Sequence, residues 1–108
     1  MVTFNEREKA FERKYQQDQE IAFKVNARRN KLLGLWAASL MGFPKDDAAA
    51  YAKEVVASDF EKPGDDDVLQ KILADFAKHE VDMSEHRVRK EMDALLEEAK
   101  QQVMKEVG

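Results

Sequence analysis

The sequence contains no cysteine, which excludes disulfides, thiolate zinc sites and cysteine nucleophiles. No apolar run approaches the roughly 20 residues needed to cross a bilayer, and the first residues lack the apolar core of a secretory signal. Only two prolines and four glycines interrupt 108 residues, and no stretch alternates apolar and polar residues as a strand would. These absences favour one all-α domain, soluble and cytoplasmic.

The common signatures of catalysis are also missing. The sequence has no phosphate-binding loop, no dinucleotide fingerprint and no serine nucleophile elbow. Its only histidines, His79 and His86, do not match the spacing of a zinc site, and we expect both to lie in water at helix ends. The run Asp65–Asp67 is explained by the favourable charge at a helix N-terminus. We therefore expect neither an enzyme nor a metal site.

Charge is divided unevenly along the chain. Residues 1–31 carry eight Lys or Arg and five Asp or Glu, a net charge of +3. Since the whole chain has a net charge of −4, the remainder carries −7. A basic N-terminal part followed by an acidic remainder permits an acidic partner for the N-terminal part. It argues against nucleic acid binding. The cluster Arg28-Arg29-Asn30-Lys31 could hold phosphates, or it could be a helix face whose aliphatic stems lie on the core.

Breaks near Pro44, at Pro63-Gly64 and at 81–84 divide the chain into helical segments. Each segment carries an apolar stripe at helical spacing, and Ser84 is placed to cap the last one. The segments are expected at 5–41, 46–62, 65–79 and 84–107. Their stripes predict an antiparallel four-helix bundle with a long first helix. The first stripe fits either one continuous helix or two collinear helices with a loose joint.

The first segment begins as a polar arm that carries Phe4, Phe11 and Tyr15 on one side. A single helix over 5–41 would be about 55 Å long and would overhang the others, and an isolated overhang is marginal in water. We therefore expect a mobile arm over 1–20 and a bundle core over 21–108. The arm could fold into a partner's groove, which the pattern favours, or it could dimerise, or it could pack back on the bundle.

Three stretches carry a specific family resemblance. They are FNEREKAFERKY, FKVNARRNKLLGLWAA and YAKEVVASDFEKPGDDDV, at residues 4–15, 23–38 and 51–68. In these stretches the chain resembles the zeta subunit of alphaproteobacterial F-type ATP synthase.

The resemblance implies a four-helix inhibitor of ATP hydrolysis, monomeric when free and peripheral to the inner membrane through the synthase. In that family the N-terminal segment becomes helical and enters a catalytic interface between the alpha and beta subunits, with the gamma subunit as a further candidate contact. Carried over to this chain, the apolar anchors would be Phe4, Phe11 and Tyr15. Arg7, Arg13 and Lys14 would then meet acidic or phosphate-bearing surroundings.

The resemblance also implies weak binding of ADP or ATP on the bundle of some members, although no cofactor is expected. The residues where such binding would be sought are Arg28, Arg29, Lys31 and Trp36. Two alternatives to the inhibitor remain. One is an adenine-nucleotide-binding module, and the other is a helical scaffold that dimerises through the arm.

Overall fold

The computed structural model describes residues 9–13, 15, 18–61 and 65–107. Its helices are α2 (Gln19–Leu40), α3 (Lys45–Glu61), α4 (Asp65–Lys78) and α5 (Glu85–Val107). Residues 9–13 form a short helical segment ahead of α2, and together with Tyr15 they are here called the N-terminal segment. Within these ranges no residue lies in a strand, so the predicted all-α class is confirmed.

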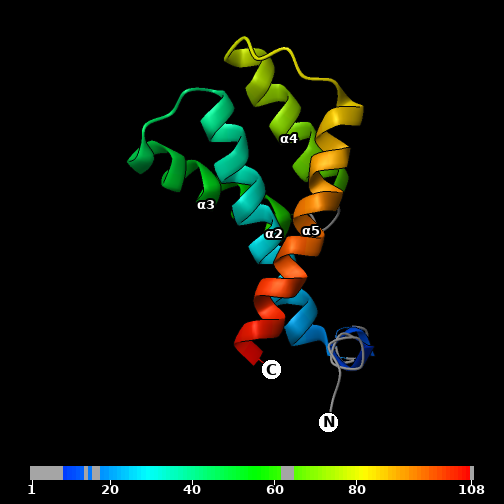
Figure 1. Cartoon of the computed structure of the whole chain (residues 1–108). Coiled ribbons are helices and arrows are strands. Elements are labelled where there is room, and N and C mark those ends of the chain that lie inside the picture. Colours follow the sequence, from blue (N-terminus) through cyan, green and yellow to red (C-terminus); the bar gives the residue numbers. More distant parts are fainter. Residues whose placement is uncertain (1–8, 14, 16–17, 62–64, 108) are drawn as a thin grey trace.

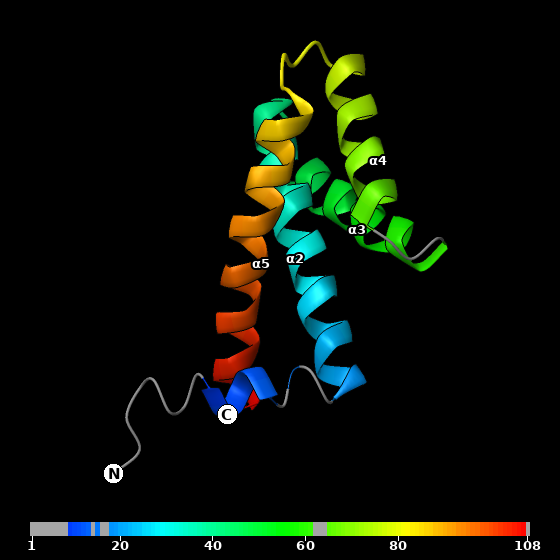
Figure 2. The same cartoon turned by 90° about the vertical axis from the view of Figure 1, so that its right-hand side faces the viewer.

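The helices α2 and α5 form an antiparallel pair that runs the length of the molecule (Figures 1 and 2). Figure 2 shows α3 and α4 beside only one half of this pair, so the other half is a two-helix stem. The structure therefore shows four packed helices, and it does not confirm the exact antiparallel four-helix bundle that was predicted. In the described parts of the chain, no helix is long and apolar enough to span a membrane.

Two groups of buried side chains match this division. The head cluster joins α2 to α3, α4 and the first half of α5, and includes Leu33, Val55, Ile72 and Phe76. The stem cluster joins the start of α2 to the end of α5. It consists of Phe11, Ile21, Val25, Ala99, Val103 and Met104.

A close approach of α2 to α3 holds the head together. A Cβ added to Gly34 would lie 2.7 Å from the Cα of Ala52 and 3.2 Å from a methyl carbon of Val55. Such contacts are far below van der Waals distance, so only glycine allows this approach. The alanine-rich face of α3 meets α2 at this point, as its small side chains predict.

The helix ends are closed by local hydrogen bonds. Gly42 has a φ of 78° after α2, and the Phe43 N–H donates to the Ala38 carbonyl at 3.0 Å. This is a Schellman motif, in which glycine adopts the left-handed conformation without strain. Glu80 occupies the same position after α4 with a φ of 59°, a conformation that costs energy for a residue with a Cβ. Ser84 accepts from the Arg87 N–H at 3.1 Å, so its predicted capping role is confirmed.

Of the two alternatives for the first segment, one continuous helix over 5–41 is wrong, because α2 begins at Gln19. Asp18 is the N-cap, with extended backbone angles (φ −107°, ψ 107°). Its carboxylate accepts from the Glu20 N–H at 2.9 Å and the Ile21 N–H at 3.4 Å. By accepting from two backbone amides, Asp18 starts a new helix, so α2 does not continue the helical residues before it. The N-terminal segment instead lies across the end of the stem (Figure 2).

Candidate partner-binding segment and basic cluster

Phe11 and Tyr15 are the described members of the predicted aromatic seam, and both lie against the stem. Phe11 is only 7% exposed and belongs to the stem cluster, and Tyr15 packs on its edge. Their ring centroids are 6.4 Å apart in a stacked arrangement. Packing back on the helices was one of three alternatives left open by the sequence, and it is the one observed for these two rings.

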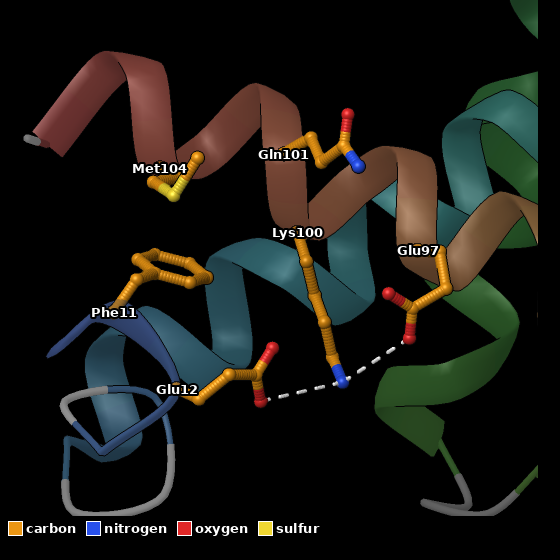
Figure 3. A pocket seen from close by; sticks show the side chains of 6 residues that line it. All are labelled: Phe11, Glu12, Glu97, Lys100, Gln101 and Met104. Carbon is orange, nitrogen blue, oxygen red and sulfur yellow. Dashed lines mark ion pairs between the residues drawn. The ribbon is translucent and has the colours of Figure 1, made fainter. Parts of the chain in front are cut away.

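Lys100 of α5 holds the N-terminal segment through several contacts. Its ammonium lies 3.8 Å from a carboxylate oxygen of Glu12 and 3.6 Å from one of Glu97. The same ammonium is 4.9 Å from the ring centroid of Tyr15, a cation–π distance. Figure 3 shows Lys100 reaching between the two carboxylates, with the Phe11 ring turned toward Met104. The sequence did not point to these α5 residues, because nothing local in α5 marks the face on which a distant segment will lie.

A surface pocket borders Phe11. A pocket of about 140 Å³ remains beside its ring, lined by Phe11, Glu12, Glu97, Lys100, Gln101 and Met104. The pocket is partly open to solvent, so it is a hollow at the edge of the contact between the N-terminal segment and α5.

Of the other predicted partner-binding residues, the structure describes only Arg13. Arg13 is exposed. Phe4, Arg7 and Lys14 lie outside the described residues. The partner-binding role of all six residues stays a prediction.

Arg28 and Arg29, predicted as candidates for phosphate binding, are held by side chains of this chain. Arg28 donates to the Gln102 side-chain oxygen at 2.9 Å and to Glu106 at 2.6 Å, which joins α2 to the end of α5. Arg29 is only 3% exposed and donates to Asp65 at 2.8 Å, at the start of α4. Both guanidinium groups are thus used in holding helices together.

The buried Arg29 is part of a polar network inside the head. Its Nε donates to the side-chain oxygen of Asn30 at 2.7 Å, and the Asn30 amide donates to Asp59 at 3.2 Å. Asn30 is 1% exposed. These bonds tie α2 to the end of α3 and the start of α4, and they satisfy polar groups that would otherwise be buried at a cost.

Lys31 and Trp36 do not meet at one site. Trp36 packs on the head cluster, with its ring 5.7 Å from that of Phe76 in an edge-to-face contact. Lys31 is exposed and lines a shallow groove of about 460 Å³ along α2. The groove residues are Phe23, Lys24, Ala27, Arg28, Lys31, Val56, Glu106 and Val107. Nucleotide binding at the four predicted residues stays a prediction that no contact here supports.

A buried phenol in the head was also not anticipated. The Tyr51 hydroxyl donates to Asp75 at 2.6 Å, and the Lys71 ammonium donates to the same carboxylate oxygen at 3.1 Å. Burial, and then the hydrogen bond to Asp75 and its charge, raise the pKa of Tyr51 well above its ordinary value. This network joins α3 to α4 and stabilises the head.

Both histidines are exposed, as predicted. His79 lies edge-to-face with Phe43 at a centroid distance of 5.0 Å, which gives it a packing role at the end of α4. His86 is in the first turn of α5. Among the described residues no three His, Asp or Glu side chains are grouped so that they could hold a metal ion.

Comparison with known proteins decides the family. The family model for ATPase inhibitor subunit zeta matches residues 1–102. The chain belongs to this family. The zeta match begins at residue 1, so it includes the N-terminal segment as well as α2 to α4 and most of α5. The resemblance predicted from the sequence is thereby confirmed, and the family is one of inhibitors and not of catalysts.

A solved structure supports the fold of this zeta chain. It is described as a solution NMR structure of a protein and is 46% identical to this chain, with a TM-score of 0.69. The match covers 78% of this chain and 95% of the other. No curated protein matches.

Proposed function

We propose that this zeta chain inhibits ATP hydrolysis by the F-type ATP synthase by inserting its N-terminal residues as a helix at an alpha/beta catalytic interface. The zeta match over residues 1–102 supports an inhibitor that acts on the synthase. The residues that would enter the interface are the predicted ones: Phe4, Arg7, Phe11, Arg13, Lys14 and Tyr15.

The observation that carries the proposal is the joint at Asp18. Because Asp18 starts α2 independently, the residues before it can change position without unwinding α2. The N-terminal segment already has helical structure over residues 9–13 and carries an aromatic ring on one side. A short amphipathic helix with one aromatic face is the form in which helices bind in a partner's groove.

The alternative functions have less support. For nucleotide binding, the two arginines predicted to hold phosphates already bind Glu106 and Asp65. For a dimeric scaffold, the seam that would pair with a second copy is partly covered by α5 through Phe11. These contacts favour an inhibitor that is monomeric when free. The family implies that it is cytoplasmic and reaches the inner membrane through the synthase.

The proposal is tested by titrating an isolated alphaproteobacterial synthase head with the double variant F11A/Y15A and following ATP hydrolysis. Aromatic anchors at interface centres commonly cost 2 kcal/mol or more when truncated, which is about 30-fold in affinity. We therefore expect the concentration for half-inhibition to rise by about 30-fold or more. The matched control is L40A, since Leu40 is an apolar residue 44% exposed at the far end of α2. Equal inhibition by the double variant and wild type would refute the anchor assignment.

A further inference from the structure

The proposed anchors are the same side chains that the chain uses internally. Phe11 is 7% exposed in the stem cluster, and it cannot fill this site and a partner's groove at once. Tyr15 packs against the same cluster beneath the Lys100 ammonium. Binding to the synthase and binding to the stem are therefore mutually exclusive for the N-terminal segment.

We propose that the stem surface around Lys100 and Met104 is an intramolecular binding site for the N-terminal segment. This site holds the segment in an inactive, docked position until a partner competes for the segment. This inference rests on the proposed function, because the segment is inhibitory only if it enters the synthase. The contact between the N-terminal segment and the stem is autoinhibitory. The segment must leave the stem before it can insert into the synthase.

The contacts of the site are suited to reversible docking. Phe11 is buried in the stem cluster, and a pocket of about 140 Å³ that is partly open to solvent lies beside it. Lys100 is 17% exposed and its partner Glu12 is 45% exposed, so this ion pair is partly screened by water. The cation–π contact with Tyr15 adds a second weak interaction from the same ammonium. Several weak contacts and one buried ring hold the segment without fixing it permanently.

The joint at Asp18 allows the segment to leave without disturbing the rest of the fold. Its carboxylate caps α2 through the Glu20 and Ile21 amides, and these bonds do not involve the N-terminal segment. Ile21 and Val25 of α2 lie in one cluster with Val103 of α5, so side chains other than Phe11 also join the two helices of the stem. Release then exposes a small apolar surface instead of unfolding a helix.

Docking has a quantitative consequence for inhibition. When only a fraction of the chains has a released segment, the apparent affinity for the partner is reduced by that fraction. Weakening the docked state should therefore make the protein a better inhibitor, although it makes the free protein less ordered. A segment that served only to stabilise the fold would show the opposite effect.

The first test removes the Lys100 ammonium with K100M, which keeps the aliphatic stem. Its matched control is K90M, since Lys90 is an exposed lysine on the same helix. Amide hydrogen exchange of the free full-length proteins should show about three- to tenfold faster exchange over residues 9–13 in K100M and no change in K90M. Half-inhibition of the synthase head by K100M should need a lower concentration than wild type does. Equal exchange in the two variants would overturn the docking site.

The second test locks the segment in place. The chain has no cysteine, so E12C/K100C introduces the only pair, which can be joined by a cleavable bis-maleimide linker. The linked protein should inhibit at least about tenfold more weakly than the same protein after the linker is cleaved. Equal inhibition before and after cleavage would overturn the autoinhibitory contact. If instead K100M changes exchange as expected but no version of the chain, wild type included, inhibits the head, the docking site stands and the proposed function fails.

Discussion

Replacing Arg29 with methionine should destabilise the protein far more than the same change at Arg28. Arg29 is 3% exposed, and its Nε donates to the side-chain oxygen of Asn30, which is itself 1% exposed. R29M leaves that buried oxygen without its donor, at a cost of about 1–3 kcal/mol. The Arg29–Asp65 bond adds little, because Asp65 is 69% exposed and water can replace the guanidinium.

The neighbouring arginine is the natural control. The Arg28 side chain is 27% exposed and its partner Glu106 is 52% exposed, so R28M should cost about 1 kcal/mol or less. Thermal unfolding followed by circular dichroism measures both. A loss of 2 kcal/mol corresponds to a melting temperature lower by about 10 °C in a domain of this size. Equal melting temperatures for R29M and wild type, or an equal drop for the two variants, would refute the view that Arg29 is a buried structural residue.

Three further predictions concern the head. G34A should lose about 1 kcal/mol in denaturant unfolding, because overpacking against Ala52 at 2.7 Å outweighs the gain in helix propensity. E80G should gain up to about 1 kcal/mol, because glycine has no strain at a φ of 59°. The raised pKa of Tyr51 means that above about pH 10 the unfolded chain loses this proton and the folded chain keeps it, so stability falls with rising pH. Y51F should lack this component, which amounts to about 1.4 kcal/mol in total between pH 9 and pH 11, in unfolding measured over that range.

Each of these three predictions can fail in a defined way. A gain in stability for G34A would show that α2 and α3 can separate at no cost. A loss for E80G would show that the Glu80 side chain makes a stabilising interaction that outweighs its backbone strain. If Y51F and wild type lose stability in parallel above pH 10, the Tyr51 phenol ionises as readily in the folded chain as in the unfolded one, and its bond to Asp75 has no effect on titration.

The helical class and most helix ends were predictable because their causes are local. Gly42 and Ser84 each act through bonds within a few residues, so the sequence shows them directly. The break at Asp18 was also local, but an unbroken apolar stripe concealed it. The cap Asp18 and the apolar Ile21 that follows three residues later were the signal that α2 starts there.

The candidate site was less predictable because its contacts join distant parts of the chain. Lys100 meets Glu12 across almost the whole sequence, and no periodicity in either stretch indicates the other. Arg29 stands in a cluster that is typical of a solvated basic face, yet it is buried and donates to Asn30 and to Asp65, which is 36 residues later. Hydrophobic spacing predicts which face of a helix is buried, and it does not predict which charged side chains pair across the fold.

The central claim is that residues before Asp18 are the inhibitory ligand. The most direct test compares ATP hydrolysis by an alphaproteobacterial synthase head with the full-length chain and with a version that begins at Asp18, which keeps the cap of α2. Circular dichroism of the shortened chain checks that the helices remain. The account predicts inhibition by the full-length chain and none by the shortened one. Equal inhibition by both would contradict it and would place the activity on α2 to α5.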